Sequence, residues 1–180
     1  MSQWNLDSTH LDIGFSVRHM MVANVKGRFT DATAQIRIDE DHPERSEVLV
    51  EIETASIDTR VADRDAHLRS ADFFDSERHP RMTFRGTQVE RTGEGEFAIT
   101  RDLTIRDVTR PVTLRGTLDG PLTDPYGNRR AGVELTGEID REQWGLGWNM
   151  ALEAGGVVVG KRVKLAIDAE IVEQVEVAAA

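Results

Sequence analysis

The chain has 180 residues, a formal net charge of −10 and an isoelectric point near 5.0, and it contains no cysteine. So acidic a balance opposes binding to nucleic acid, because a phosphate backbone is held by clustered cations. The lack of thiols excludes disulfides, thiolate metal sites and cysteine nucleophiles. The length fits one domain, and we expect it to span residues 1–174, with a frayed tail at residues 175–180.

The N-terminal residues MSQWNLDSTH contain neither the basic segment nor the apolar run of a secretory signal. No later window is apolar enough to cross a membrane, so we expect no transmembrane segment. On these grounds the sequence predicts a cytoplasmic protein.

Apolar and polar residues alternate along much of the chain, which is typical of β-strands with one face toward solvent. The first such run contains the apolar residues Leu11, Ile13, Phe15 and Val17. The same alternation returns in residues 48–52, 97–105, 112–118, 133–139 and 163–171. Short polar turns join consecutive runs, so we expect the strands to be antiparallel.

The apolar positions change parity twice, between Phe29 and Ile36 and again between Ile52 and Ile57. A β-bulge produces such a switch where a sheet bends. Two bends of this kind favour a sheet that closes on itself, so the sequence predicts an all-β barrel. The one long departure from the alternation, near residues 60–70, predicts a short helix that acts as a lid.

The predicted lid helix carries a carboxylate on its apolar face. Asp65 lies three residues before Leu68, and Thr59 is the expected N-cap. An unpaired buried carboxylate would cost several kcal/mol, so Asp65 needs a partner, either Arg64 or backbone N–H groups of the next loop. Two interpretations stay open. The cluster is either a structural clamp for the lid, or Arg64, Asp65 and His67 form a polar rim at the mouth of a cavity.

Two pairs of aromatic residues lie outside the regular strands. Phe73 and Phe74 follow the helix, and neighbouring side chains of an extended segment point to opposite faces. We therefore expect one ring to plug the barrel and the other to cap it. Trp144 and Trp148 flank glycines beside a long loop, where indoles suit either a gate at the barrel mouth or a packed corner.

His19 and Arg101 are polar residues at positions whose parity points inward. His19 extends the odd-numbered apolar run of the first strand, and Arg101 lies between Ile99 and Leu103. The structural alternatives are an imidazole that is satisfied in the core and an arginine whose head reaches the barrel rim. The functional alternative places both at the head group of a ligand, where Arg101 would meet an anion.

The five histidines show no metal-binding spacing, since no two form a His-x-His or HExxH pair. The chain also lacks a GxSxG nucleophile elbow and the glycine-rich loops that hold phosphates. We therefore expect no metal site, no required cofactor and no catalytic residue.

Four blocks of sequence resemble, in order, the YceI-like family of polyisoprenoid-binding, lipocalin-like barrels. They are WNLDSTHLDIGFSVRHMMVANVKGRF, ASIDTRVADRDAHLRSADFFDSERHPRMTF, DLTIRDVTRPVTL and EIDREQWGLGWNMALEAGGVVVGKRVKLAIDAEI. The resemblance implies an extended eight-stranded antiparallel barrel, commonly a homodimer, that holds a polyisoprenoid, an isoprenoid quinone or a related amphiphilic lipid as its ligand. Relatives are often exported to the periplasm, and the family commonly carries glycine where this chain has Arg101.

The tail of such a lipid would set its affinity. One five-carbon isoprene unit offers roughly 4 kcal/mol at about 0.8 kcal/mol per buried CH₂, whereas an exposed head-group charge pair contributes about 0–1 kcal/mol. We expect tail contacts from the inward residues Phe15, Val17, Phe29, Val50, Ile52, Phe73, Phe74, Phe84, Ile99, Leu103, Leu146 and Trp148. We expect head-group or mouth contacts from His19, Arg64, Asp65, His67, Arg101 and Trp144.

Three functions fit these observations. The first is noncatalytic carriage or sequestration of a long-chain amphiphilic lipid. The second is a stress-linked interaction protein whose barrel is filled by its own side chains, which an eight-stranded barrel also permits. The third, an enzyme acting on a hydrophobic substrate, would need His19, Asp65 and His67 to converge.

Overall fold

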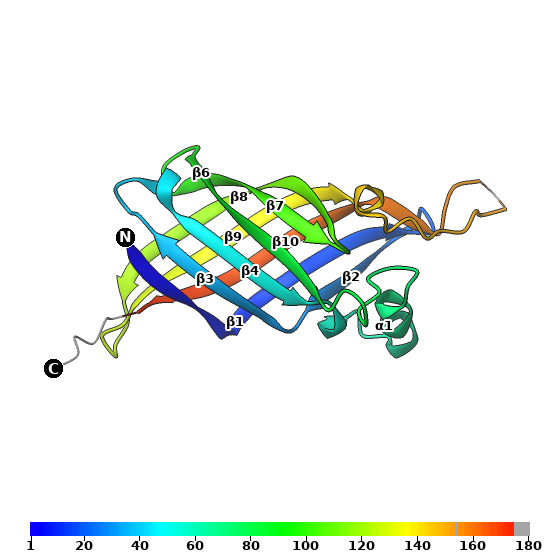
Figure 1. The fold of residues 1–180 in the computed structure, drawn as a ribbon, viewed down its shortest axis with the longest axis horizontal. Helices are drawn as coiled ribbons and strands as arrows, with labels where there is room; N and C mark the ends of the chain where they lie inside the picture. The colour runs from blue at the N-terminus through cyan, green and yellow to red at the C-terminus, as the bar shows by residue number, and fades with distance from the viewer. Residues whose placement is uncertain (154, 175–180) are drawn as a thin grey trace.

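The computed structural model describes residues 1–153 and 155–174, and most of them belong to long antiparallel strands (Figure 1). The predicted tail at residues 175–180 lies outside the described residues. The strands are β1 (Ser2–His19), β2 (Ala23–Phe29), β3 (Ala32–Ile38), β4 (Glu47–Glu53), β5 (Ile57–Asp58), β6 (Arg81–Arg91), β7 (Glu96–Ile105), β8 (Val108–Thr123), β9 (Arg129–Asp140) and β10 (Val159–Glu173). The helical segments are α1 (Ala62–Arg69) and the 3₁₀ turns η1 (Pro43–Arg45), η2 (Thr54–Ser56) and η3 (Arg141–Trp144).

The sheet closes because β1 pairs with β10, the last strand of the chain. Along its other edge β1 pairs with β3 near its start and with β2 over its second half. β2 and β3 therefore act as one bent strand, and β4 and β5 pair with them in the same way. Counted like this, eight strands form a closed antiparallel barrel with one short helix, which confirms the predicted fold class.

Both predicted parity switches coincide with bends in the sheet. Thr30 and Asp31 separate β2 from β3, and η2 separates β4 from β5. A third irregularity lies in β1, where Leu6 pairs with Ile171 but Leu11 pairs with Ala169. Residues 7–10 therefore bulge out of β1 opposite a single residue of β10.

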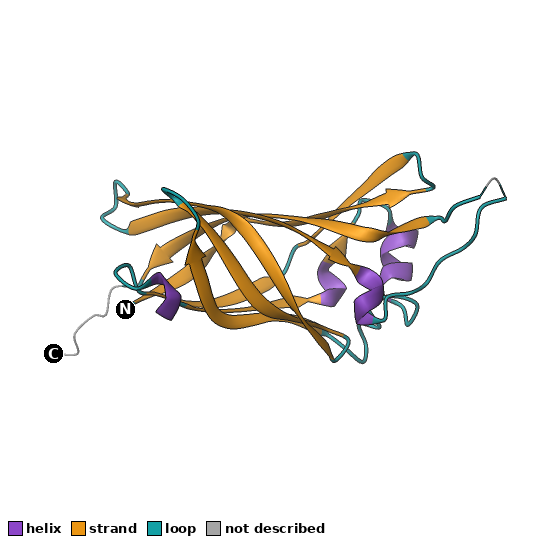
Figure 2. Cartoon of the chain, turned by 90° about the horizontal axis from the view of Figure 1, so that it is seen from above, coloured by secondary structure: helices purple, strands orange, loops and turns teal. Residues whose placement is uncertain are grey.

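One end of the barrel carries α1, the turn between β1 and β2, and the loop segments of residues 145–153 and 155–158 that precede β10 (Figures 1 and 2). The other end carries the turns between β3 and β4, β6 and β7, and β8 and β9. The expectation that Thr59 caps α1 is wrong, because the N-cap is Val61 and no side chain caps it. Among the described residues, no helix is long and apolar enough to span a bilayer.

The inward side chains form two hydrophobic clusters. The larger one gathers around Phe29, Ile57, Phe84 and Trp144. The smaller one contains Trp4, Ala131 and Ile171, and half-buried hydrophobic side chains pack against both. The inward faces are therefore mainly apolar at both ends of the barrel, as the alternation of the strands dictates.

Candidate functional site

The barrel interior holds two neighbouring cavities, so its own side chains do not fill it. The helix-end cavity, which lies toward α1, has a volume of about 230 Å³, and the far-end cavity has a volume of about 530 Å³. Both are lined by Ile13, Val48, Val50, Ile99 and Leu135. The two cavities therefore follow one another along the barrel, and the larger lies in the range of roughly 300–1,000 Å³ that is typical of ligand pockets.

The helix-end cavity is lined almost entirely by apolar side chains. Of the twelve residues expected to contact a lipid tail, all except Trp148 line it. These are Phe15, Val17, Phe29, Val50, Ile52, Phe73, Phe74, Phe84, Ile99, Leu103 and Leu146. The ring of Phe15 lies directly over Gly27, where the Cβ of any other residue would collide with it. A glycine at this position of β2 therefore leaves room for an aromatic side chain in the cavity wall.

Phe73 and Phe74 both line the helix-end cavity, so the expectation that one faces inward and the other outward is wrong. The reason is local conformation. These residues lie in a turn and not in an extended segment, so their side chains do not alternate. Phe74 packs edge-on against Phe29, with ring centroids 5.6 Å apart.

Among the described residues that line the helix-end cavity, Arg141 alone is charged, and the sequence patterns did not single it out. Its guanidinium donates hydrogen bonds to the backbone carbonyls of Leu146 and Gly160 and lies 5.9 Å from the centre of the Phe73 ring. Burial lowers the pKa of this group. Arg141 thus fastens the loop after η3 to β10.

The far-end cavity combines apolar walls with a charged rim. Its interior is lined by residues such as Ile36, Phe97 and Ile171. Its charged lining residues are Asp39, Glu40, Arg91, Glu94 and Glu96, which lie at or next to the strand ends at this side of the barrel. Glu40 is ion-paired with Arg129 at 2.9 Å. The other three carboxylates outnumber the guanidinium of Arg91, so this rim is acidic.

Asp65 and Arg64 form a structural clamp around Thr59. The buried carboxylate of Asp65 accepts hydrogen bonds from the backbone N–H of Thr59 at 2.9 Å and from its hydroxyl at 2.5 Å. Arg64 donates from Nε to the Thr59 hydroxyl at 2.7 Å and from Nη2 to the Thr59 carbonyl at 2.8 Å. Neither Arg64 nor Asp65 lines a cavity, so the geometry matches the clamp and not a polar rim.

His67 connects α1 to the turn that contains Phe73 and to the loop after η3. Its Nε2 lies 2.8 Å from Oδ2 of Asp72, and its ring meets Phe73 and Trp148 edge-on, with centroids 5.2 and 4.6 Å away. Trp148 therefore packs on His67 and Phe73. It lines neither cavity, so the expectation that it contacts the lipid tail is wrong. Trp148 belongs to an irregular loop, where parity gives no inward direction.

Trp144 was expected at the barrel mouth but lies in the core. Its indole N–H donates to the carbonyl of Leu103 at 3.0 Å, and the side chain is fully buried. The packed-corner alternative therefore describes it, because an indole with its one donor satisfied can be buried without penalty. His19 ends β1, is half-buried, and lies outside both cavity linings.

Arg101 points inward, as its parity predicts, but reaches neither a cavity nor the rim. It is 2% exposed, and its stem crosses β6 at Gly86, where no side chain blocks the path. Its Nη2 lies 3.3 Å from the Ser46 carbonyl, and its Nε has no hydrogen-bond partner among the described residues. Burial lowers the pKa of Arg101 to about 10. Contact with an anionic head group is not possible in this position.

The YceI-like domain family matches residues 4–171 of the chain. The chain belongs to this family. It is 37% identical over 171 residues to the UPF0312 protein SERP2314 of Staphylococcus epidermidis, covering 94% of this chain and 97% of that protein. It is 38% identical over 168 residues to protein YceI of Escherichia coli O157:H7, covering 93% of this chain and 84% of that protein.

Solved structures share the YceI-like barrel. BcnA of Burkholderia cenocepacia superposes with a TM-score of 0.80 at 18% identity, covering 92% of this chain and 98% of that one. The YceI protein of Campylobacter jejuni gives 0.74 at 28% identity, with coverage of 88% and 90%. A polyisoprenoid binding domain from Saccharophagus degradans gives 0.69 at 13% identity, with coverage of 97% and 100%. The barrel fold is thus common to proteins of very different sequence.

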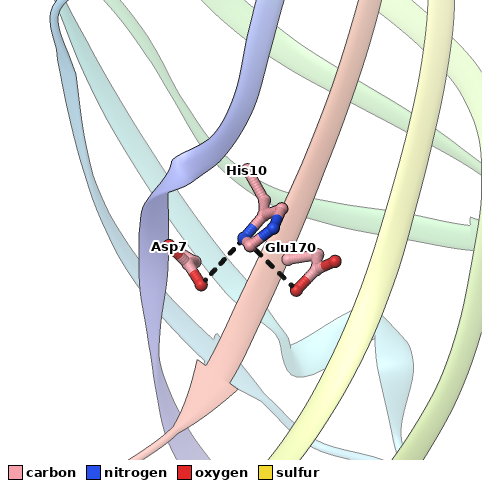
Figure 3. Close-up of side chains that lie close together, drawn as sticks. All are labelled: Asp7, His10 and Glu170. Atoms are coloured by element: carbon pink, nitrogen blue, oxygen red, sulfur yellow. Dashed lines mark hydrogen bonds and ion pairs between the residues drawn. The ribbon is translucent and has the colours of Figure 1, made fainter.

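A cluster of ionisable side chains from β1 and β10 fixes the bulge of β1 (Figure 3). Nδ1 of His10 lies 3.2 Å from Asp7 and 3.8 Å from Glu170. These groups are possible metal ligands, but Arg130 already donates to both carboxylates, at 2.9 and 3.2 Å, and also binds Asp124 at 2.8 Å. A guanidinium in this place would repel a metal ion, so the cluster is an ion-pair network.

The ion pairs of Arg130 should make the stability of the barrel depend on pH. Hydrogen bonds from Thr9 and Arg130 hold the pKa of Asp7 far below its usual 3.8, and Arg130 and Asn128 do the same for Asp124. A lowered folded-state pKa stabilises the fold above the unfolded-state value and loses that effect as the pH falls below it. Arg130→Met should therefore lower the Tm near neutral pH, and the difference from wild type should shrink below about pH 4.

Thermal unfolding followed by circular dichroism at several pH values checks this expectation. The matched control is Arg162→Met, which removes a more exposed pair with Glu138 and should change the Tm little at any pH. A deficit of Arg130→Met that stayed constant down to acid pH would show that Arg130 acts through packing and not through its charge.

Proposed function

We propose that this YceI-like barrel binds a long-chain amphiphilic lipid, such as a polyisoprenoid or an isoprenoid quinone, and carries or sequesters it without changing it chemically. The observation that carries the proposal is the pair of neighbouring cavities with apolar walls inside the barrel. Each CH₂ group buried there contributes about 0.8 kcal/mol, so a few isoprene units offset the entropy lost on binding. The description of the Saccharophagus degradans domain as polyisoprenoid binding supports the same ligand class.

The distribution of charge indicates how the lipid would lie. The tail fits the helix-end cavity, whose lining has a single charge that is already bound to backbone carbonyls. The head would then lie toward the far-end rim, where Asp39, Glu94 and Glu96 repel a phosphate or a carboxylate. An uncharged head, such as a quinone ring, fits this rim better than an anionic one.

Extraction of the recombinant protein with organic solvent, followed by mass spectrometry, tests the proposal. We expect a prenyl or acyl species to co-purify, and we expect ligand-free protein to take up added ubiquinone. Neither a co-purified lipid nor uptake of the quinone would be compatible with a lipid-binding barrel. Sedimentation of the same samples tests the predicted homodimer.

A further inference from the structure

Four exposed large apolar side chains at the helix end of the barrel gather on one projection, whereas a fifth, Val61, precedes α1. Met20, Met21 and Val22 form the turn between β1 and β2, and Met150 lies on the neighbouring loop. We call these four residues the apolar tip. Val22 is 78% exposed and Met150 is 57% exposed. Figure 1 shows that the turn and the loop project from the same end of the barrel.

The two parts of the apolar tip are joined by backbone hydrogen bonds. The N–H of Met20 donates to the carbonyl of Val158 at 2.8 Å, and the N–H of Val158 donates to the carbonyl of Met150 at 3.0 Å. Met20 and Met21 have φ values of 49° and 61°, a conformation that asparagine and glycine adopt more easily. Turn stability therefore does not account for methionine here, whereas a need for an exposed apolar surface does.

The apolar tip is continuous with the wall of the helix-end cavity. Val17 lines that cavity three residues before Met20, and Val159 lines it directly after Val158. His19 and Val159 are paired across β1 and β10. Only a few residues of β1 and β10 therefore separate the apolar tip from the cavity proposed to hold the lipid tail.

The chain around the apolar tip is basic, although the protein as a whole carries a charge of −10. Residues 16–26 and 147–164 contain one acidic residue, Glu153, and the five cations Arg18, Lys26, Lys161, Arg162 and Lys164. Lys161 and Arg162 are paired with Glu142 and Glu138. In the described part of the chain, the other three cations form no ion pair, and Lys26 and Lys164 flank Ser16 on either side.

We infer that the apolar tip docks the barrel on the surface of an anionic lipid bilayer, with its methionines and valine in the interfacial region and the cations behind them facing the head groups. This inference rests on the proposed function, because a carrier of a membrane lipid must exchange its ligand with a bilayer. It names the partner of the proposed carrier, which is a membrane, and the end of the barrel that binds to this membrane.

Flotation of the full chain with unilamellar vesicles tests the inference. Wild type should float with vesicles of phosphatidylcholine and phosphatidylglycerol, and less with pure phosphatidylcholine or at high salt. The double variant Val22→Asp, Met150→Asp should bind the mixed vesicles at least about tenfold more weakly, because two carboxylates replace inserted apolar side chains. Both positions are exposed, so the fold should be retained.

The opposite end of the barrel offers a matched control. Leu122 and Tyr126 are 60% and 89% exposed there, and the variant Leu122→Asp, Tyr126→Asp should float like wild type. Equal loss in both variants, no loss in the tip variant, or a change in the tip variant's oligomeric state would overturn membrane docking.

Uptake of ubiquinone added from ethanol separates this inference from the proposed function. The tip variant should keep that uptake, since its cavities are intact. Uptake without any flotation of wild type refutes the docking surface alone. Absence of uptake in wild type refutes the proposed function, and the docking inference that depends on it, whatever the vesicles show.

Discussion

Val50→Trp should abolish uptake of a quinone by the barrel. Val50 lines both cavities, so an indole at this position occupies the space where the two meet. Displacing a single isoprene unit forfeits roughly 4 kcal/mol, which weakens binding by more than about a hundredfold. The free energy of unfolding should change by only about 1–3 kcal/mol, because a cavity is available to receive the ring. Quenching of the protein's tryptophan fluorescence by the quinone measures uptake, and urea unfolding measures the free energy of unfolding.

The matched control is Leu49→Trp. Leu49 is the preceding residue of β4, it points out of the barrel, and it lies outside both cavity linings. Its replacement should leave uptake unchanged. Leu103→Trp, which blocks only the helix-end cavity, should also abolish uptake if the tail lies there. Full uptake by both interior variants would mean that the lipid binds elsewhere on the protein.

The period of the strands explains why the cavity wall was predictable from the sequence. Side chains alternate between the two faces of a strand, so Phe15, Val50 and Ile99 had to face the same side as their apolar neighbours. The bends at Thr30 and at η2 were visible as changes of parity. Closure of the sheet then placed all these side chains around one interior, which is where the cavities lie.

Residues outside the regular strands were beyond such prediction. The turn that directs both Phe73 and Phe74 inward has no period, and neither has the loop that lays Trp148 on His67. The ion pair of Arg130 with Asp7 joins residues 123 positions apart, so no local sequence pattern predicts it. Arg101 had the correct inward parity, but the side chain is long enough to turn away from the cavities over Gly86.

Asp65→Ala should destabilise the protein by about 2–4 kcal/mol. The change removes the acceptor of two hydrogen bonds and leaves the buried N–H and hydroxyl of Thr59 without it. Asp65→Asn keeps one acceptor oxygen in a similar place and should cost less, about 1–2 kcal/mol. Urea unfolding of the ligand-free protein measures both losses.

The clamp should also govern how long the lipid stays bound. α1 is held to Thr59 by this clamp, and the segment that follows supplies Leu68, Phe73 and Phe74 to the helix-end cavity. A looser clamp should therefore speed the release of quinone from Asp65→Asn, a variant that is stable enough for this measurement. Asp63→Ala, an exposed position in the first turn of α1, is the control and should alter neither stability nor release appreciably. An unchanged release rate in Asp65→Asn would show that the lid does not limit exit, so the lipid would leave by the far-end rim.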